Sequence, residues 1–249
     1  MALKQWRLTR YALMMTTWIG TSGFQYPEWK GTFYPSDLPA SKMLAFYSER
    51  FGTTEINYSF HRIPSAKTID GWWKGTPERF KLSLKAPQKV THFAKLRDCG
   101  DTLRFFHQVI CDLEKKIGCV LFQLPPTLKK DTELLRVFLH DVPEAMRCAF
   151  EFRHDSWLDD ETYELLRSRN AALCIADSEK LSTPAIATAD FGYLRLRRED
   201  YAPADIARWA ETIKAQQSAW SEAFVYFKHE ESGIGPKFAQ EMIRVLHAE

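Results

Sequence analysis

The sequence lacks the cysteine patterns that mark metal sites and disulfide frameworks. No two of its cysteines are spaced as C-x-x-C, and their number is odd: they are Cys99, Cys111, Cys119, Cys148 and Cys174. Three of them fall in apolar, strand-like runs, where a free cysteine usually acts as a small core residue. This usage is typical of a reducing compartment, so we predict a cytoplasmic protein.

Strong net charge and long apolar runs are also missing. The formal net charge is only +2 at pH 7, which argues against a protein coated with positive charge for nucleic acid and leaves electrostatic steering to a local patch. No run is long and apolar enough to span a bilayer, so we expect no membrane partner. The sequence gives no indication of the oligomeric state.

The first residues carry a pattern that loosely resembles a signal peptide. Lys4, Arg7 and Arg10 precede a short apolar stretch over residues 11–19. No small-residue cleavage site follows, and the stretch continues into a strand-like segment with glycines. We therefore predict an N-terminal extension over residues 1–14, with translation starting at Met1, Met14 or Met15, and one domain over residues 15–249.

Short apolar or β-branched runs alternate with helical patterns along the chain. The predicted strands are 17–22, 53–59, 79–85, 118–124, 147–153, 171–177, 191–197 and 222–228. The predicted helices are 41–51, 65–74, 101–117, 131–140, 159–169, 202–217 and 236–247. Eight strand runs in 249 residues fit a closed parallel barrel better than an open sheet. We predict an α/β fold, a (β/α)8 TIM-type barrel of parallel strands with an outer ring of helices.

Each predicted strand has an apolar face and a face that ends in polar side chains. Residues two apart on a strand point the same way, and the apolar face should pack against the helices. The polar groups should then point into the barrel near the carboxyl ends, where barrel enzymes build their sites. The inward residues predicted in this way are Glu55, Asn57, Lys81, Ser83, Lys85, Gln123, Glu151, Arg153, Asp177, Arg195, Arg197 and Lys228.

One interpretation of these charges is a buried salt-bridge layer with a structural role, pairing Glu55 with Lys85 and Glu151 with Arg153. Buried charges are tolerated only when they are paired. The inward cations outnumber the inward carboxylates, however, and an unbalanced buried cluster is costly unless an anion or solvent completes it. This imbalance favours a functional site.

Small and aromatic residues follow the first predicted strand. Gly20, Ser22 and Gly23 allow a ligand close to the backbone and leave N–H groups for an anion. Tyr26 and Trp29 come next, and such aromatics either stack on a ligand or close the barrel mouth. Both interpretations remain open.

Histidines lie just beyond several predicted strand ends, at positions 61, 92, 154 and 229. With Glu151 and Asp177 they are ligand types that bind zinc, although no H-x-H or H-E-x-x-H spacing is present. The sequence requires no cofactor, and a divalent metal remains an open alternative.

Several segments together carry a family resemblance. They are Trp18-Ile19-Gly20-Thr21-Ser22-Gly23-Phe24, Glu55-Ile56-Asn57-Tyr58-Ser59-Phe60, Lys85-Ala86-Pro87, Gln123-Leu124-Pro125-Pro126 and Glu151-Phe152-Arg153-His154 with Ser156-Trp157. Over residues 15–247 the chain resembles the DUF72 (YecE-like) family. The resemblance implies a TIM barrel and, by likeness of that family to endonuclease IV-type barrels, binding of nucleic acid or phosphate esters. Many members carry Arg-x-His-Gly on the seventh strand, whereas this chain has Arg195-Leu196-Arg197-Arg198.

The function we favour from the sequence is an enzyme, with hydrolysis as the reaction class, acting on an anionic small molecule or a nucleotide-like phosphate ester. Glu151 or Asp177 would act as general base and Glu55 as its partner, with His154 and His92 as proton donors. The predicted ligand-binding residues are Ser22, Tyr26, Trp29, Asn57, Lys85, His92, Gln123, Arg153, Trp157, Arg195 and Lys228.

Two other functions remain open. The first is a glycoside hydrolase that uses Glu55 and Glu151 as paired carboxylates, with Tyr26, Trp29 and Trp157 as sugar platforms. The second is a non-catalytic module that binds single-stranded nucleic acid or a partner on the aromatic, cationic barrel mouth.

Overall fold

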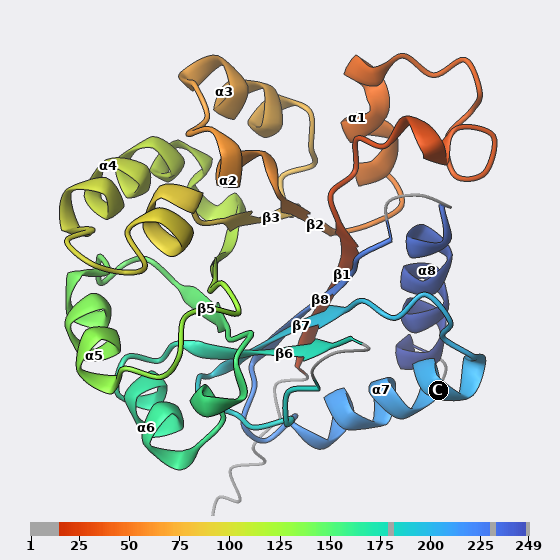
Figure 1. Ribbon diagram of the computed structural model, residues 1–249. Coiled ribbons are helices and arrows are strands. Elements are labelled where there is room, and N and C mark those ends of the chain that lie inside the picture. Colours follow the sequence, from red (N-terminus) through yellow and green to blue (C-terminus); the bar gives the residue numbers. More distant parts are fainter. Residues whose placement is uncertain (1–14, 179–181, 230–232, 248–249) are drawn as a thin grey trace, which may run out of the picture.

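A closed barrel of parallel strands forms the centre of the molecule. The computed structural model describes residues 15–178, 182–229 and 233–247, so the predicted extension over residues 1–14 lies outside the described residues. The strands follow one another around the barrel from β1 to β8, and β8 pairs with β1. Helices surround the strands (Figure 1). The predicted (β/α)8 TIM-type barrel is confirmed. Within the described ranges, no helix has the length and apolar character needed to cross a membrane.

The strands are β1 (Thr16–Ser22), β2 (Thr53–Ile56), β3 (Lys81–Lys85), β4 (Ile117–Gln123), β5 (Cys148–Glu151), β6 (Ala172–Asp177), β7 (Phe191–Leu196) and β8 (Glu222–Phe227). The α-helices are α1 (Met43–Ser48), α2 (Tyr58–His61), α3 (Ala66–Lys74), α4 (Gly100–Ile110), α5 (Thr132–Asp141), α6 (Asp160–Ser168), α7 (Pro203–Ala215) and α8 (Ile234–His247). Short 3-10 helices are η1 (Pro27–Trp29), η2 (Ala40–Lys42), η4 (Cys111–Lys116) and η5 (Asp155–Trp157), and η3 (Lys89–Phe93) is a π-helix.

Several predicted elements have different bounds in the structure, and in two of them the backbone angles show where the pattern breaks. The strand predicted over residues 53–59 ends at Ile56, because Asn57 adopts helical backbone angles (φ −84°, ψ −18°) and α2 begins at the next residue. The helix predicted over residues 101–117 is divided into α4 and η4, and Glu114 within η4 has φ 47°. Left-handed backbone at a residue other than glycine interrupts a helix.

Toward the amino-terminal ends of the strands, the barrel interior is filled by apolar side chains of unequal size. Strands β4 to β6 contribute small residues such as Cys119, Ala149 and Cys174. Strands β7 and β8 contribute large aromatic residues, namely Phe191, Tyr193, Phe224 and Tyr226. Small side chains on one side of the barrel therefore leave room for large ones on the other. The interior is a packed core and not a pore.

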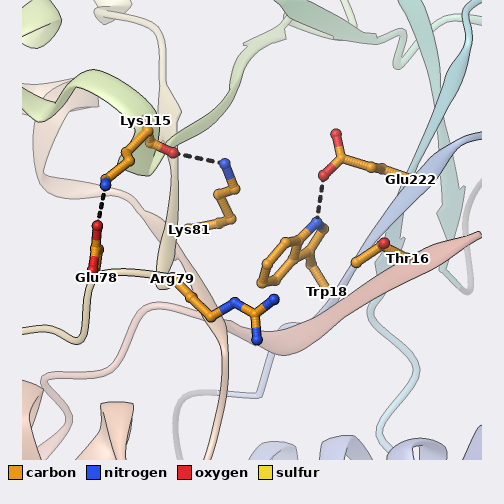
Figure 2. A pocket seen from close by; sticks show the side chains of 7 residues that line it. All are labelled: Thr16, Trp18, Glu78, Arg79, Lys81, Lys115 and Glu222. Carbon is orange, nitrogen blue, oxygen red and sulfur yellow. Dashed lines mark hydrogen bonds and ion pairs between the residues drawn. The ribbon is translucent and has the colours of Figure 1, made fainter.

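Polar residues surround a hollow of about 770 Å³ at the amino-terminal end of the barrel (Figure 2). Trp18 donates a hydrogen bond from Nε1 to Glu222 Oε1 (2.8 Å), and Arg147 forms an ion pair with the same carboxylate. Lys81 donates to the backbone oxygen of Lys115 (2.6 Å). These contacts lie at the end of the barrel that usually serves stability rather than catalysis.

Tyr47 of α1 fixes the first two strands to the helical layer. Its buried hydroxyl accepts hydrogen bonds from the backbone N–H of Thr21 (2.7 Å) and from Thr21 Oγ1 (2.8 Å), and it donates to the backbone oxygen of Thr53 (3.1 Å). One hydroxyl thus positions the carboxyl end of β1, which leads directly to Ser22.

We expect Tyr47→Phe to lower the free energy of unfolding by about 1–3 kcal/mol, because buried donors and an acceptor lose their partner. Chemical denaturation of both proteins measures this difference. Tyr58→Phe, which removes a hydroxyl from a side chain that is 44% exposed, is the matched control and should change stability by less than about 0.5 kcal/mol. Equal stabilities of Tyr47→Phe and the unmodified protein would contradict this role.

Candidate functional site

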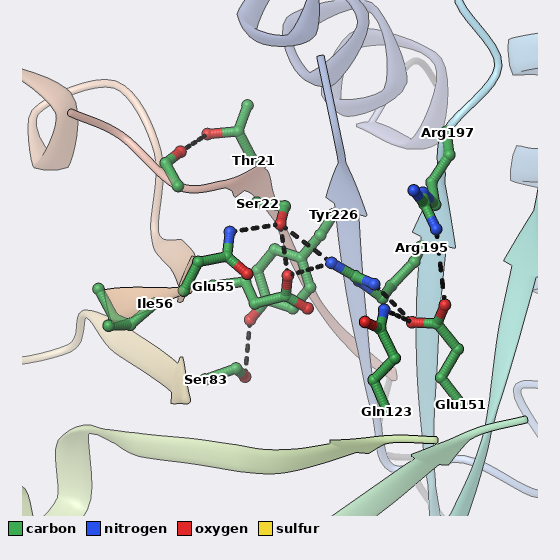
Figure 3. Close-up of polar contacts among 12 residues, drawn as sticks. Thr21, Ser22, Glu55, Ile56, Ser83, Gln123, Glu151, Arg195, Arg197 and Tyr226 are labelled. Atoms are coloured by element: carbon green, nitrogen blue, oxygen red, sulfur yellow. Dashed lines mark hydrogen bonds and ion pairs between the residues drawn. The ribbon is translucent and has the colours of Figure 1, made fainter. Parts of the chain in front are cut away.

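Arg195 is the centre of a polar cluster inside the barrel, near the carboxyl ends of the strands. Its side chain extends from β7 into the interior and is 1% exposed. One terminal amino group donates to Glu55 Oε1 (2.8 Å), and the other forms an ion pair with Glu151 Oε2. Figure 3 shows the guanidinium between the two carboxylates. Arg195 therefore connects β7 with β2 and β5.

Glu55, at the inner face of β2, has partners on two other strands, β1 and β7. Its Oε1 also accepts a hydrogen bond from Ser22 at the end of β1, and its Oε2 accepts one from Tyr193 (2.7 Å). Ser22 Oγ in turn accepts hydrogen bonds from Asn57 Nδ2 (3.0 Å) and from Arg195 (3.2 Å). The carboxylate is fully buried, and these donors replace the water that it loses.

Glu151, at the end of β5, is surrounded by cations. Arg153 Nε donates to its Oε1 (3.0 Å), Gln123 Nε2 donates to its Oε2 (2.8 Å), and Arg197 lies 3.6 Å from Oε1. Burial alone raises the pKa of this carboxyl, but Arg195 and Arg153 outweigh burial, so the net effect is a pKa well below the usual range. Glu151 is therefore ionised wherever the protein is folded at moderate pH.

Lys85 and His92 lie at the edge of this cluster. The Lys85 ammonium is over the ring of Phe60, 3.9 Å from its centroid. Burial and the nearby charge of Arg195 lower the pKa of Lys85 to about 8. The His92 ring meets the Phe60 ring edge to face, and burial with the charges of Lys85 and Arg153 lowers its pKa. The imidazole is thus neutral at pH 7.

Most of the predicted inward residues do come together. Direct hydrogen bonds or ion pairs connect Ser22, Glu55, Asn57, Gln123, Glu151, Arg153 and Arg195. Lys228 follows β8 at the same end of the barrel, and its backbone N–H donates to Leu196 (3.0 Å). Tyr26 lies in the loop after β1, where its hydroxyl donates to the backbone oxygen of Ser22 (2.8 Å).

The prediction that Asp177 points into the barrel is wrong. Asp177 shares its strand face with Leu173 and Ile175, which pack against the helices. Its carboxylate accepts hydrogen bonds from Tyr201 (2.8 Å) and from Trp209 of α7 (3.1 Å). The inner face of β6 is instead the one with small residues, including Cys174. An acidic residue on the outer face is stable because two aromatic donors satisfy it.

Trp29 and Trp157 do not line the site, which corrects the expectation that they contact a ligand. Both side chains are fully buried. Trp29 packs against Phe33 and Tyr34, and Trp157 stacks on Phe152 while its Nε1 donates to the backbone oxygen of Leu128 (2.8 Å). Their large apolar surface is more favourably buried in the core than left at the barrel mouth.

The predicted histidines and carboxylates do not gather as metal ligands. His154 caps η5, where its Nδ1 accepts a hydrogen bond from the backbone N–H of Ser156 (3.2 Å). Glu151 is occupied by guanidinium groups and Asp177 lies outside the barrel. Within the part of the chain that the structure describes, no three His, Cys, Asp or Glu side chains are close enough to hold a metal ion.

Two residues of the cluster were missing from the predicted site. Tyr193 is two residues before Arg195 on the same face of β7, so strand alternation predicts that its side chain also points into the barrel. Arg197, two residues after Arg195, was predicted to point inward but was not assigned a ligand role. Its pKa is lowered by burial, and Glu151 offsets part of that effect.

Arg195→Met should lower the free energy of unfolding by about 3–5 kcal/mol, because two buried carboxylates lose their common cation. Chemical denaturation at pH 7 gives this value. The matched control is Arg197→Met, since Arg197 is partly exposed and lies 3.6 Å from Glu151; its effect should stay below about 1 kcal/mol. Equal losses for the two variants would contradict the central role of Arg195.

The acid dependence of stability should also depend on Glu151. A carboxyl whose pKa is lower in the folded state adds stability above its unfolded pKa, and that stability is lost as the pH falls. Below about pH 4.5, the stability of the unmodified protein should therefore fall more steeply than that of Glu151→Gln, by up to about 1.4 kcal/mol per pH unit. Denaturation curves between pH 3 and pH 6 measure both slopes, and identical slopes would contradict the lowered pKa.

Comparisons with known proteins agree with this architecture. An alignment of 148 positions, which covers 53% of this chain, is 30% identical to UPF0759 protein YunF of Bacillus subtilis (strain 168), and it spans about half the length of that relative. A DUF72 family protein of Thermotoga maritima has a similar crystal structure, with a TM-score of 0.82 and 27% identity over 93% of this chain and 99% of the other. A DUF72 family protein of Enterococcus faecalis V583 has the same fold, with a TM-score of 0.77 and 17% identity over 93% and 95% of the two chains.

The family model that matches this chain is described as "Protein of unknown function DUF72", and it covers residues 18–249. The match includes each strand from β2 to β8 and all residues of the polar cluster around Arg195. The chain belongs to the DUF72 family.

Proposed function

We propose that the barrel mouth binds an anionic small molecule, such as a phosphate ester or a nucleotide-like compound, and acts on it. The main support for the proposal comes from the hydrogen-bond contacts of Arg153 and Arg197. Each uses one nitrogen on Glu151, and their other guanidinium nitrogens form no hydrogen bond with any residue the structure describes. Guanidinium groups with unused N–H donors can bind a carboxylate or a phosphate through two parallel hydrogen bonds.

The charge balance supports the same conclusion. Glu55 and Glu151 are the carboxylates of the cluster, and Arg195 already binds both. Lys85, Arg153 and Arg197 add positive charge that these carboxylates do not neutralise. Burial lowers the pKa values of Lys85 and Arg197, and the positive charge of Arg195 lowers both as well; a bound anion would raise them.

In this proposal Glu151 positions the cations rather than accepting a proton from the substrate. Its oxygens accept hydrogen bonds or ion pairs from four side chains, and its low pKa makes it a weak base. Glu55 is similarly bound to Arg195, Ser22 and Tyr193. The two carboxylates are thus part of the framework that aims Arg153 and Arg197 at the ligand.

The two alternative functions have less support from the contacts. A glycoside hydrolase needs one carboxyl that keeps its proton and one that is available to the sugar, but both glutamates bind Arg195. The sugar and nucleobase platforms expected at Trp29 and Trp157 are buried in the core. An anionic small molecule requires neither a free carboxyl nor these platforms.

Isothermal titration calorimetry tests the proposal with matched pairs of ligands. At pH 7 and about 50 mM salt, ribose 5-phosphate and AMP should bind at least about tenfold more tightly than ribose and adenosine. Arg153→Gln and Arg197→Gln should each weaken AMP binding by about tenfold or more, since a hydrogen bond to a charged group contributes about 1.5–3 kcal/mol. Product analysis by mass spectrometry then shows whether a bound ester is hydrolysed.

Arg79→Gln is the matched control. Arg79 is an exposed arginine at the amino-terminal end of the barrel, so its removal changes the net charge equally without touching the cluster. Binding should be unchanged in this variant. If AMP and adenosine bind alike, or if Arg79→Gln weakens AMP as much as Arg197→Gln, the barrel mouth is not the anion site.

A further inference from the structure

Lys85 is an amine of the barrel interior that lies against this cluster and, in the described part of the chain, does not join its hydrogen bonds. It ends β3, on the same inward face as Ser83 and Lys81. Within the described ranges its Nζ forms no hydrogen bond or ion pair, and its contact is the face of Phe60. Lys85 is only partly buried, so part of its surface is open to solvent.

The arrangement of the neighbours keeps this amine apart from the carboxylates. Glu55 is held by Ser22, Tyr193 and Arg195, and Glu151 by Gln123 and three arginines. Lys85 lies near Arg195 and Arg153, and their positive charges lower its pKa. An amine in such surroundings loses its proton more easily than an exposed lysine, and the neutral amine is the nucleophile.

We propose that Lys85 forms an imine with a carbonyl substrate that carries a carboxylate or a phosphate. This inference rests on the proposed anion site, because Arg153 and Arg197 would hold the anionic group while the carbonyl carbon lies at Nζ. The substrate class is therefore an anionic aldehyde or ketone, such as a 2-oxo acid or a phosphorylated sugar in its open-chain form.

The chemistry is balanced without an added oxidant or reductant. The neutral Nζ attacks the carbonyl carbon and forms a C–N bond, and one proton moves from this nitrogen to the carbonyl oxygen to give a carbinolamine. Loss of that oxygen as water leaves the imine, and proton uptake at nitrogen makes it a cation that draws electrons from the neighbouring carbon. His92, neutral at pH 7 and packed on the same Phe60 ring, is a suitable group to carry these protons.

Reductive trapping tests this proposal on the full-length protein. Pyruvate, glyoxylate or glyceraldehyde 3-phosphate is added with cyanoborohydride, which reduces an imine to a stable secondary amine, and peptide mass spectrometry finds the modified lysines. At pH 7.5 we expect Lys85 to be labelled about tenfold or more faster than Lys67, an exposed lysine of α3, since a lower pKa gives a larger neutral fraction. Acetaldehyde, which has no anionic group for Arg153 and Arg197 to hold, should show a smaller preference for Lys85, due to the lower pKa alone.

Lys81→Met is the matched control for Lys85→Met. Lys81 lies on the same face of the same strand, at the opposite end of the barrel. The preferential label should disappear in Lys85→Met and persist in Lys81→Met. Labelling of all exposed lysines in proportion to their exposure, with no preference for Lys85, would overturn the proposal.

The pH profile separates a reactive amine from one that is merely accessible. Burial and the charges of Arg195 and Arg153 lower the pKa of Lys85, and Glu55 and Glu151 raise it. The net value is about 8. The ratio of Lys85 to Lys67 labelling should therefore fall as the pH rises above 8. Phe60→Leu removes the ring that stabilises the ammonium, so its ratio should start to fall at a lower pH; a ratio that does not depend on pH in either protein contradicts a reactive amine.

The outcome for the imine is distinguishable from that for the anion site. If AMP or pyruvate binds with the expected dependence on Arg197 but no label appears at Lys85, the anion site stands and the imine is wrong. If neither binding nor label depends on these residues, both are wrong.

Discussion

The polar site depends on the contact of one buried guanidinium with two buried carboxylates. Arg195 lies inside the barrel between Glu55 and Glu151 and thereby connects β7 with β2 and β5. Burying three charges is costly, and it is tolerated because each also has hydrogen-bond partners, among them Ser22 and Tyr193. A layer of this kind is a sensitive part of the fold, since the loss of one member leaves the others buried and unpaired. It also fixes the directions of the cations that surround it.

The cluster is not balanced in charge, and the proposed anion site rests on this imbalance. A purely structural layer would match cations with carboxylates, whereas here Arg153 and Arg197 share a carboxylate that Arg195 already binds. Their remaining N–H groups and the amine of Lys85 lie at the carboxyl ends of the strands, which is where barrels of this type place ligands. An anion at this point would complete the charge balance of the cluster. The same positive surroundings that favour an anion also favour a neutral, nucleophilic Lys85.

Much of this arrangement follows from strand alternation in the sequence, and its failures have physical causes. Alternation correctly brings Glu55, Glu151 and Arg195 together, because each lies on the strand face opposite Ile56, Phe150 or Leu194, which pack in the apolar core. It fails at Asp177, since β6 is apolar on both faces and small side chains rather than polar ones face the interior. It also fails at Trp29 and Trp157, because sequence position places an aromatic residue in a loop but cannot show that the loop folds back into the core. Which cations contact Glu151 depends on the distances between strands, and alternation along one strand gives no information about those distances.

The most direct measurement of the central claim is a crystal structure of the protein with AMP at low salt and pH 7. We expect the phosphate within hydrogen-bond distance of the guanidinium groups of Arg153 and Arg197, with the contacts from Arg195 to Glu55 and Glu151 unchanged. A phosphate bound elsewhere, for example among Arg79, Lys81 and Lys115 at the opposite end of the barrel, would contradict it. So would a structure in which the phosphate displaces Arg195 from the two carboxylates.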